Sequence, residues 1–458
     1  MIPCCHRRRC LLLLLLVAFF ALVSHFWLGS YTNIGLTGVF QGEPASLQDD
    51  VDHQGRLKQT TIPSDAHTHG FTVFEELYLR DGTLYIMTDN PDSFPPLSHI
   101  LSQPGRRAAG VSLTPTDNEM QVINPADAEA ILGDRVLRLS GFTVLLYEPE
   151  QFMNHYYHWW GEIVLGLWRV YSKLGTGLNG TITPLPFPAR FIAPFVEESG
   201  WRDPASINGP IMRVAFPTTA VENGHYWQDL IEIEATVVFS RVIVVNRESA
   251  HLHPFSGLWY KMIAGTMNVT VPEGFWEPIR HSVLNNLLGY IPKFDAVSSK
   301  PVVTYITRQR RTLIHSHHRA LVRELRKLRV EGICEVLVVR MEEMTLKQQI
   351  ELAARTTIML GVHGNGLTHQ LWMTPSTKST VIEIFIPTGY TFDYELLARN
   401  LGHRHYGIWN DTALTYPKGT THKGVNFPPG FHGNDIPVQA ETVTRIIRER
   451  LQQPSLSN

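Results

Sequence analysis

The chain has 458 residues, of which 43% are hydrophobic and 18% are charged, and its formal net charge is −2. A charge this close to zero disfavours a nucleic-acid partner or a general polyanion-binding role. The length is more than one ordinary hydrophobic core supports and is typical of two domains.

The N-terminus combines basic residues with an apolar block. Three arginines at residues 7–9 precede an apolar run over residues 11–28, which only Ser24 and His25 interrupt. A membrane-spanning helix needs roughly 20 mostly apolar residues, with about 17 as the lower limit. The pattern predicts a short transmembrane anchor, with residues 1–10 in the cytoplasm and the rest of the chain in the lumen. A cleaved signal peptide has the same pattern, but bulky residues extend the block and no small-x-small cleavage site follows cleanly.

Cysteine usage agrees with this topology. Cys4, Cys5 and Cys10 lie in the expected cytoplasmic tail, and Cys334 alone follows the anchor. Cysteines next to a membrane are candidates for S-palmitoylation, and free thiols are the alternative. A single lumenal cysteine cannot form an intramolecular disulfide, so the hydrophobic core must stabilise the lumenal part.

Three N-glycosylation sequons support lumenal exposure, although so short a pattern often arises by chance. They begin at Asn179, Asn268 and Asn410. Residues 29–68 are polar, lack a sustained apolar period, and are expected to form a stem between the membrane and the folded part. Because the C-terminal residues do not form an endoplasmic-reticulum retrieval signal, the Golgi membrane is the expected location.

Residues 69–300 are predicted to form the first domain. Short apolar segments bounded by turn residues predict strands at 84–87, 142–147, 190–193 and 242–245. The segment 154–174, rich in aromatic and aliphatic residues, is predicted to be a helix.

The last third of the chain alternates more regularly. Strands are predicted at 302–306, 335–340, 358–362 and 381–386, and helices at 319–329, 346–355, 367–373 and 392–401. Such alternation predicts a parallel sheet covered on both faces, whose ligands bind at the carboxyl ends of the strands. Residues 301–458 are therefore expected to form a second, nucleotide-binding domain.

Two features suited to phosphate follow strand ends in this second domain. The glycine-rich residues 361–366 open a helix, where glycine lets the backbone approach a ligand and N–H groups favour an anion. Arg308 and Arg311 follow another strand, and arginine forks match phosphate oxygens. The alternatives are an ordinary strand-to-helix turn and a solvated basic turn. Together the two features support phosphate binding more strongly than either does alone.

Histidine and carboxylate side chains share one face of the predicted helix 154–174. His155, His158 and Glu162 are three and four residues apart. Histidine and glutamate are the usual general bases, so His158 and Glu162 are candidate catalytic residues. The alternative is a polar helix edge that meets solvent or caps a neighbour.

Other polar groups need a partner or are discounted. Glu383 lies in an apolar strand, so its carboxylate needs a partner such as a ribose hydroxyl or an arginine. His315, His317 and His318 lack the spacing of helical zinc motifs and a completing cysteine or carboxylate, so they are expected in a polar loop without a metal. The Asp-Val-Asp motif at residues 50–52 lies in the expected stem and is discounted as a metal–nucleotide motif.

Several motifs resemble those of glycosyltransferase family 61. In chain order they are NHYYHWWGE at 154–162, Arg247 after a strand, Ile306-Thr307-Arg308 followed by Arg311, MTLKQQ at 344–349, VHGNGLT at 362–368 and VIEI at 381–384. The similarity covers most of the region after the anchor, weakly before residue 240 and strongly from 302 to 406.

The resemblance implies a GT-B fold, in which two facing Rossmann-like domains follow an N-terminal transmembrane helix and the second domain holds most of the donor. It implies a single-pass type II membrane enzyme that inverts the anomeric centre and uses a UDP-sugar, usually without a metal or other cofactor. The donor-binding residues it implies are Arg308 and Arg311 for the diphosphate, His363, Gly364, Asn365 and Gly366 along it, and Glu383 for the ribose.

Known members of the family transfer xylose, arabinose or GlcNAc to glycans or secreted proteins. Membership favours xylose, with GlcNAc next, as the sugar moved to a glycan or glycoprotein acceptor. The scarcity of lumenal cysteines departs from the animal members. A catalytically inactive, carbohydrate-binding pseudo-enzyme with the same fold is the alternative.

Overall fold

The computed structural model describes residues 57–106, 108, 110–176, 183–292, 300–310, 312–416, 420 and 424–452. The predicted anchor at residues 11–28, the cysteines before it and most of the predicted stem lie outside these residues. Among the described residues, no helix is both long and apolar enough to cross a membrane.

The folded region starts earlier than the sequence indicated. Thr60 and Ala66 are almost fully buried, and Thr61 forms an antiparallel bridge with Glu75. The Thr60 hydroxyl donates a hydrogen bond to the carbonyl of Glu76 at 2.6 Å. The expectation that the stem extends to residue 68 was therefore wrong at its C-terminal end, because the Thr60 side chain and the Thr61 backbone bond to the sheet instead of to water.

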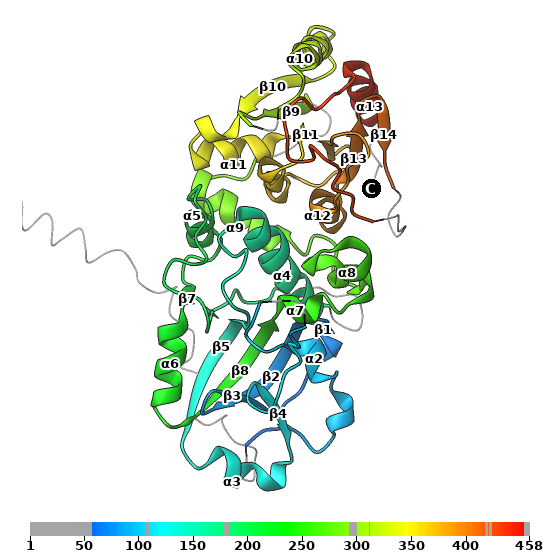
Figure 1. The fold of residues 1–458 in the computed structure, drawn as a ribbon. Helices are drawn as coiled ribbons and strands as arrows, with labels where there is room; N and C mark the ends of the chain where they lie inside the picture. Colours follow the sequence, from blue (N-terminus) through cyan, green and yellow to red (C-terminus); the bar gives the residue numbers. More distant parts are fainter. Residues whose placement is uncertain are drawn as a thin grey trace, which may run out of the picture. The chain divides into compact units, whose positions relative to one another are not determined.

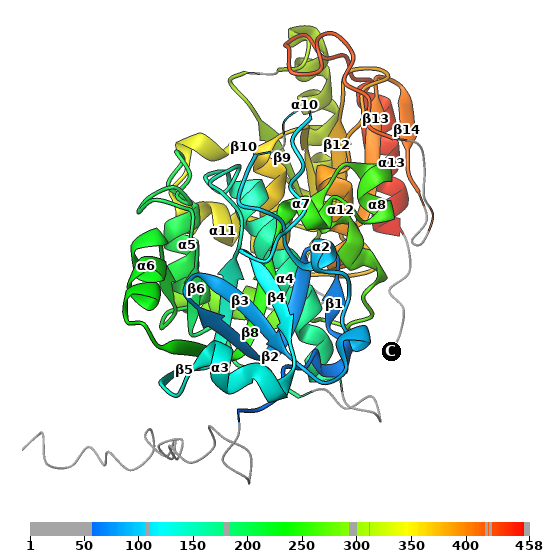
Figure 2. The same cartoon turned by 60° about the horizontal axis from the view of Figure 1, so that its bottom comes forward.

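The first half of the chain forms a mixed sheet (Figures 1 and 2). Within the described residues its order is β4-β3-β2-β8-β5-β6-β7, with β1 paired to β2. The strands are β1 (His67–Thr68), β2 (Phe71–Arg80), β3 (Thr83–Met87), β4 (Met120–Ile123), β5 (Val136–Leu146), β6 (Arg190–Ile192), β7 (Ala220–Glu222) and β8 (Thr236–Val245). β8, β5, β6 and β7 are parallel, whereas β2 runs antiparallel to β3 and β8.

The sequence did not predict the central strand β2, because Glu75 and Glu76 interrupt its apolar run. Both carboxylates have partners on other strands of the sheet, Glu75 on the adjacent β8 and Glu76 on β5, the strand beyond it. Arg241 Nη2 lies 2.5 Å from Glu75, and Arg138 donates to both oxygens of Glu76 at 2.8 and 2.7 Å. These cross-strand ion pairs allow charged residues in a strand with otherwise buried side chains.

Helices and short 3-10 turns connect and cover this sheet. The helices are α2 (Leu97–Ile100), α3 (Ala128–Leu132), α4 (Leu165–Ser172), α5 (Asn208–Ala215), α6 (Gly224–Glu232), α7 (Arg247–Ala250), α8 (Pro254–Trp259) and α9 (Glu277–Leu288). The predicted helix 154–174 is a π-helix, Tyr157–Val164, that continues into α4. A Cβ atom at Gly166 would lie 2.6 Å from the ring of Phe71, so glycine lets this helix approach β2 closely.

The second half forms the parallel sheet that the alternating pattern predicted. Its strands are β9 (Val302–Thr307), β10 (Glu335–Arg340), β11 (Ile358–Val362), β12 (Thr380–Ile384), β13 (Arg404–Trp409) and β14 (Thr412–Leu414). Within the described residues the order is β10-β9-β11-β12-β13-β14, with β14 alone antiparallel to its neighbour. β10 and β14 are the opposite edges of the sheet in both ribbon views (Figures 1 and 2). The helices of this half are α10 (His315–Val330), α11 (Leu346–Arg355), α12 (Asp393–Leu401), α13 (Ala440–Gln452) and the 3-10 helix Asn365–Trp372.

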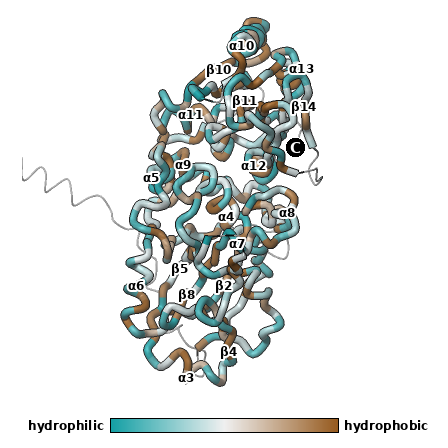
Figure 3. The backbone as a smooth tube through the Cα atoms, in the orientation of Figure 1, coloured by the Kyte–Doolittle hydropathy of each residue, from teal (hydrophilic) through white to brown (hydrophobic). Residues whose placement is uncertain are grey.

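The expected polar loop at residues 315–318 is instead the first turn of α10. His317 Nδ1 accepts a hydrogen bond from the backbone N–H of Val438 at 3.1 Å, and His318 Nδ1 lies 3.0 Å from the Tyr305 hydroxyl. The helix buries Leu321, Leu325 and Leu328, and hydrophilic and hydrophobic segments alternate along it (Figure 3). The histidines therefore extend an amphipathic helix beyond the predicted residues 319–329.

One apolar cluster contains residues of both halves. The rings of Trp160 and Trp372 lie 5.5 Å apart, and the Trp372 indole N–H donates to the Tyr156 hydroxyl at 2.8 Å. The Trp276 indole donates to the carbonyl of Leu371 at 2.9 Å. Removing a buried tryptophan of this kind typically costs about 3–5 kcal/mol. This cluster fixes the π-helix against the second sheet and so positions the residues described next.

Candidate functional site

The carboxyl ends of β9 and β11 bring two predicted donor-binding features together. The strands are parallel neighbours, and Gly361 pairs with Ile306 in their register. The chain moves outward from β9 to β10 and crosses back to β11, so the strand order reverses at this pair. Ligands of open parallel sheets bind outside the carboxyl ends of the strands at such a reversal. Arg308 follows β9 here, and His363 follows β11.

Arg308 lies against the glycine loop. Its Nη1 atom donates a hydrogen bond to the carbonyl oxygen of His363 at 2.6 Å. Gly364 has a φ of +149°, and a Cβ atom there would lie 1.7 Å from the same Nη1 atom. Glycine is therefore needed both for the backbone conformation and for the approach of the guanidinium. The structure thus brings the arginine turn and the loop together, while Arg311 lies outside the described residues.

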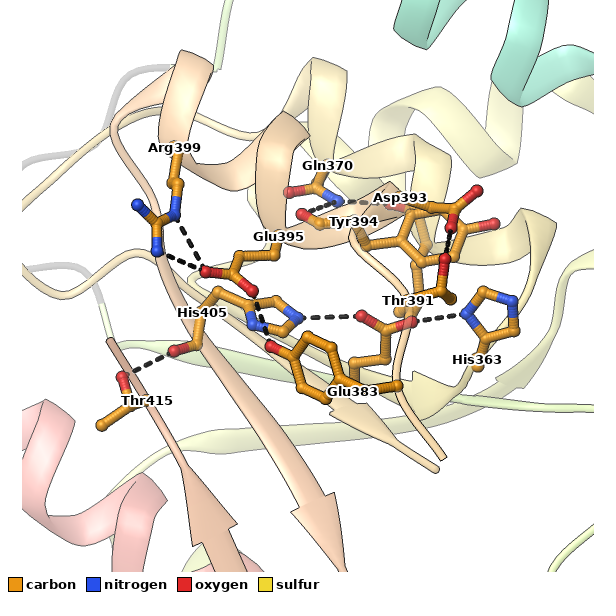
Figure 4. Close-up of polar contacts among 12 residues, drawn as sticks. His363, Gln370, Glu383, Thr391, Asp393, Tyr394, Glu395, Arg399, His405 and Thr415 are labelled. Carbon is orange, nitrogen blue, oxygen red and sulfur yellow. Dashed lines mark hydrogen bonds and ion pairs between the residues drawn. The ribbon is translucent and has the colours of Figure 1, made fainter. Parts of the chain in front are cut away.

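Glu383 on β12 lies in the interior, between two histidines (Figure 4). Its Oε1 atom is 2.6 Å from Nδ1 of His363, and its Oε2 atom is 2.8 Å from Nε2 of His405 on β13. The predicted need for a partner was correct, but both oxygens bond to histidine and the carboxyl group is fully buried. This placement differs from the ribose contact that we expected.

Burial governs the protonation of this group. It raises the pKa of Glu383 well above its usual value, and the neighbouring Asp393 and Glu395 act in the same direction. Burial also lowers the pKa of His363 to about 4. Both shifts favour the uncharged forms of the glutamate and the histidine near neutral pH.

His158 belongs to a second cluster, which is charged. Its Nδ1 atom lies 2.6 Å from Glu162 Oε2, and the same oxygen accepts a hydrogen bond from Arg247 Nη1 at 2.7 Å. Burial alone would raise the pKa of Glu162, but Arg247 and His158 hold it well below its usual value. Burial also raises the pKa of Glu148, which accepts the backbone N–H of Arg247, to about 7. Of these two glutamates, Glu162 is therefore the one that is ionised at neutral pH and pairs with the charged Arg247.

This geometry separates the roles of the two predicted catalytic residues. The side chain of His158 is 22% exposed, whereas that of Glu162 is 2% exposed. A charged Glu162 accepts the Nδ1 proton of His158, which leaves Nε2 with a lone pair. His158 can therefore take a proton from a ligand, and Glu162 orients it. Both lie in the π-helix Tyr157–Val164, a conformation frequent at functional sites.

Contacts of Tyr157 and Tyr394 bring the two clusters close to each other. The backbone N–H of Tyr157 donates to Asn365 Oδ1 in the glycine loop at 3.2 Å. The ring of Tyr157 lies 5.1 Å from that of His158 and 5.6 Å from that of Tyr394. Tyr394 in turn lies 5.4 Å from the ring of His363. One aromatic path therefore connects the two histidines.

The sequence did not predict an ion pair that lies beside Tyr157 and connects residue 261 to the start of α12. Lys261 Nζ lies 2.8 Å from Asp393 Oδ2, and it is 5.9 Å from the centre of the Tyr157 ring. Burial would raise the pKa of Asp393, but Lys261 holds it below its usual value. Neither residue belongs to a motif with recognisable spacing. His405 was missed because its strand, β13, was not predicted.

A comparison with family models decides the class of the chain. The model described as Glycosyltransferase 61 matches residues 156–380. This match supports membership of the chain in glycosyltransferase family 61. No curated protein matches it. The matched segment includes His158 and Glu162 of the charged cluster. It also includes Arg308 and the glycine loop with His363, which belongs to the cluster around Glu383.

Membership in family 61 supports glycosyltransferase activity and implies a nucleotide sugar and a glycan acceptor. The mixed α/β architecture with parallel strands fits a Rossmann-like glycosyltransferase. Among the residues that the structure describes, no group of three or more His, Cys, Asp or Glu side chains is arranged to hold a metal ion.

The remaining predicted site residues of this family 61 protein lie apart from the two clusters or outside the described residues. Asn268 is exposed, and Asn410 is half-buried with a φ of 49°. Asn179 lies outside the described residues. The exposed His155 lies next to the second cluster, with 5.0 Å between its ring centre and that of His158.

Proposed function

We propose that this family 61 protein is an inverting glycosyltransferase that moves a sugar from a UDP-sugar to a glycan or glycoprotein acceptor in the secretory pathway. Xylose is the favoured sugar and GlcNAc the next, on family membership. One observation carries the proposal. His158, oriented as a base, lies close to the loop that holds Arg308, because Tyr157 is bonded to Asn365.

In this proposal the two sheets belong to the two Rossmann-like domains of a GT-B fold. Residues 69–300 form the acceptor side, and residues 301–458 form the donor side. The donor diphosphate binds where the strand order of the second sheet reverses. Arg308 and Arg311 supply positive charge there, and Gly364, Asn365 and Gly366 supply backbone N–H groups at the start of a 3-10 helix. His363 lines the same loop, but its backbone N–H already donates to the carbonyl of Ile384. Glu383 is not assigned to the ribose, because it is buried and bonded to two histidines.

The chemistry is a single displacement. The oxygen of the acceptor hydroxyl bonds to the anomeric carbon while its proton passes to Nε2 of His158. The bond between the anomeric carbon and the phosphate oxygen breaks, and its electron pair leaves with UDP. Glu162 stabilises the imidazolium that forms, and Arg308 offsets the charge that develops on the leaving diphosphate. We therefore propose that transfer needs no metal ion.

A donor panel on the purified full-length protein tests this function. UDP-xylose should support transfer to a glycan acceptor, with UDP-GlcNAc second, and a chelator should not change the rate. Activity that disappears with chelator and returns with manganese would contradict the metal-free mechanism. Binding of UDP-sugars or glycans without transfer or hydrolysis would identify a carbohydrate-binding pseudo-enzyme instead.

The cellular part of the proposal is a type II Golgi membrane protein anchored by residues 11–28, with its catalytic part in the lumen. The arginines before this segment and the sequons after it support this topology. Expressed in eukaryotic cells, the protein should migrate faster after glycosidase treatment and stay in the membrane pellet after a carbonate wash. An untagged form that starts near residue 25 in the medium would show that the segment is cleaved.

A further inference from the structure

Glu383 joins two histidines through hydrogen bonds that need two protons. One bond connects it to Nδ1 of His363 at 2.6 Å, and the other to Nε2 of His405 at 2.8 Å. Each bond requires a hydrogen on one of its two atoms. A charged glutamate would accept both hydrogens, whereas a neutral glutamate would donate one and accept the other. The charge of Glu383 therefore decides whether both histidines donate a hydrogen to it or only one of them does.

The partners of Glu383 differ from those of Glu162, which is also buried. In the part of the chain that the structure describes, no arginine or lysine forms an ion pair with Glu383, whose ion-pair partners are His363 and His405. Glu162 instead has Arg247 at 2.7 Å. A buried carboxylate without a paired cation is costly, and such a group takes up a proton.

The charged groups around Glu383 favour the same state. Asp393 and Glu395 on α12 oppose its ionisation, whereas the nearby cation Lys261 favours it. Lys261 is already paired with Asp393 at 2.8 Å. Glu395 is paired with Arg399 at 2.5 Å. The neighbouring cations thus neutralise other carboxylates.

We propose that Glu383 is a neutral carboxyl group that donates its proton to Nδ1 of His363 and accepts the Nε2 proton of His405. His363 then presents a proton on its own Nε2 atom to the diphosphate of the donor. This inference rests on the proposed donor site. Glu383 and His405 are positioning residues, because they act through His363.

The position of His363 fits this role. Its second ring nitrogen points away from Glu383 (Figure 4), its side chain is 14% exposed, and its carbonyl oxygen holds Arg308. A lone pair on Nε2 would repel phosphate oxygens, whereas an N–H group donates to them. The opposite proton arrangement differs only by shifts along the two hydrogen bonds, without a change in net charge. A bound diphosphate therefore selects the arrangement that we propose.

The two histidines of the site then carry opposite tautomers. His158, bonded to a charged glutamate, has a lone pair on Nε2 and acts as the base. His363, bonded to a neutral glutamate, has a proton on Nε2 and acts as a donor to an anion. Pairs of titratable groups whose surroundings separate their protonation states in this way mark acid and base roles.

UDP titration of the purified full-length protein by calorimetry tests the proposal. Glutamine reproduces the shape and the donor and acceptor atoms of a neutral glutamate. Glu383→Gln should therefore keep the Kd for UDP within about threefold, whereas Glu383→Met and His363→Ala should raise it by about tenfold or more. A Gln variant as weak as the Met variant would show that a charged Glu383 is needed and would overturn the proposal. Wild-type protein that binds no UDP would instead overturn the donor site itself.

A second test measures the Tm of the protein as a function of pH. It needs no ligand, and it remains valid if the Glu383→Met variant does not fold. Folding raises the pKa of Glu383, so its contribution to wild-type stability is present at low pH and is lost as pH rises above about 4.5. The Tm of Glu383→Gln relative to wild type should therefore increase between about pH 5 and 8. Glu162→Gln is the matched control with the opposite sign. Folding lowers the pKa of Glu162, so this variant should be most destabilised at neutral pH and approach wild type as pH falls. The same sign for both variants would refute the assignment.

Discussion

Replacing Arg308 with alanine tests the donor site most directly. Arg308 is half-buried, and its guanidinium is fixed by the 2.6 Å hydrogen bond to the carbonyl of His363. A hydrogen bond to a charged group contributes about 1.5–3 kcal/mol, and about 1.4 kcal/mol is a factor of ten in affinity. Since water partly screens a half-buried side chain, we expect the lower part of this range. Arg308→Ala should raise the Kd for UDP by roughly tenfold, and up to a hundredfold if both guanidinium branches contact the diphosphate.

Calorimetry with UDP measures this effect, and two further variants sharpen it. Gly364→Ala should also weaken binding, because its Cβ atom would lie 1.7 Å from Nη1 of Arg308. In the Arg308→Ala background the same substitution should cost less, since the clash is removed, and a double-mutant cycle quantifies the difference. Arg310→Ala is the control, because Arg310 is exposed in the same turn. Unchanged UDP affinity in a folded Arg308→Ala protein, or an equal loss in Arg310→Ala, would refute the reasoning.

Three other predictions follow from the clusters. His158→Ala should lower kcat by about 10²–10⁴-fold, the range for a lost general base, and should leave the Kd for UDP unchanged. Steady-state kinetics measures kcat and calorimetry measures the Kd. A kcat near that of the wild type would show that the base lies elsewhere. Glu162→Gln removes the closer of the two carboxylates beside the buried Arg247 and should cost about 3–5 kcal/mol in urea unfolding at neutral pH, whereas wild-type stability would contradict the charged cluster. Trp372→Ala should cost about 3–5 kcal/mol in the same assay, and a loss below about 1 kcal/mol would show that its contact with Trp160 does little to stabilise the core.

Much of the second sheet could be predicted from local sequence. β9 and β11 are short apolar runs that alternate with helices, and strands buried on both faces need no distant partner to be recognised. β2 could not be predicted in this way. Its glutamates are stabilised by Arg138 and Arg241, which lie 62 and 166 residues away in the chain. A local pattern contains no information on such partners, so a charged strand looks like a loop.

The same limit applies to the histidines of α10 and to His405. The first were expected in a loop because their polar character hid the amphipathic period of the helix. The second lies on β13, where only the pairing with β12 brings its Nε2 atom to Glu383. Side chains that meet across neighbouring strands are recognised once the strand order is known, and not before.

The sequence by itself determined which residues are available to the site and on which side of an element they lie. Arg308 and the glycine loop follow parallel strands, whose carboxyl ends meet at one sheet edge, and His158 and Glu162 share a helical face. Only the tertiary structure decided what the buried residues Glu162 and Glu383 do. Each is bonded to a histidine, but Arg247, 85 residues along the chain, reaches Glu162, and Glu383 bonds instead to His405. Whether a buried carboxyl group is charged depends on the cations that folding places beside it, and spacing along the chain does not specify them.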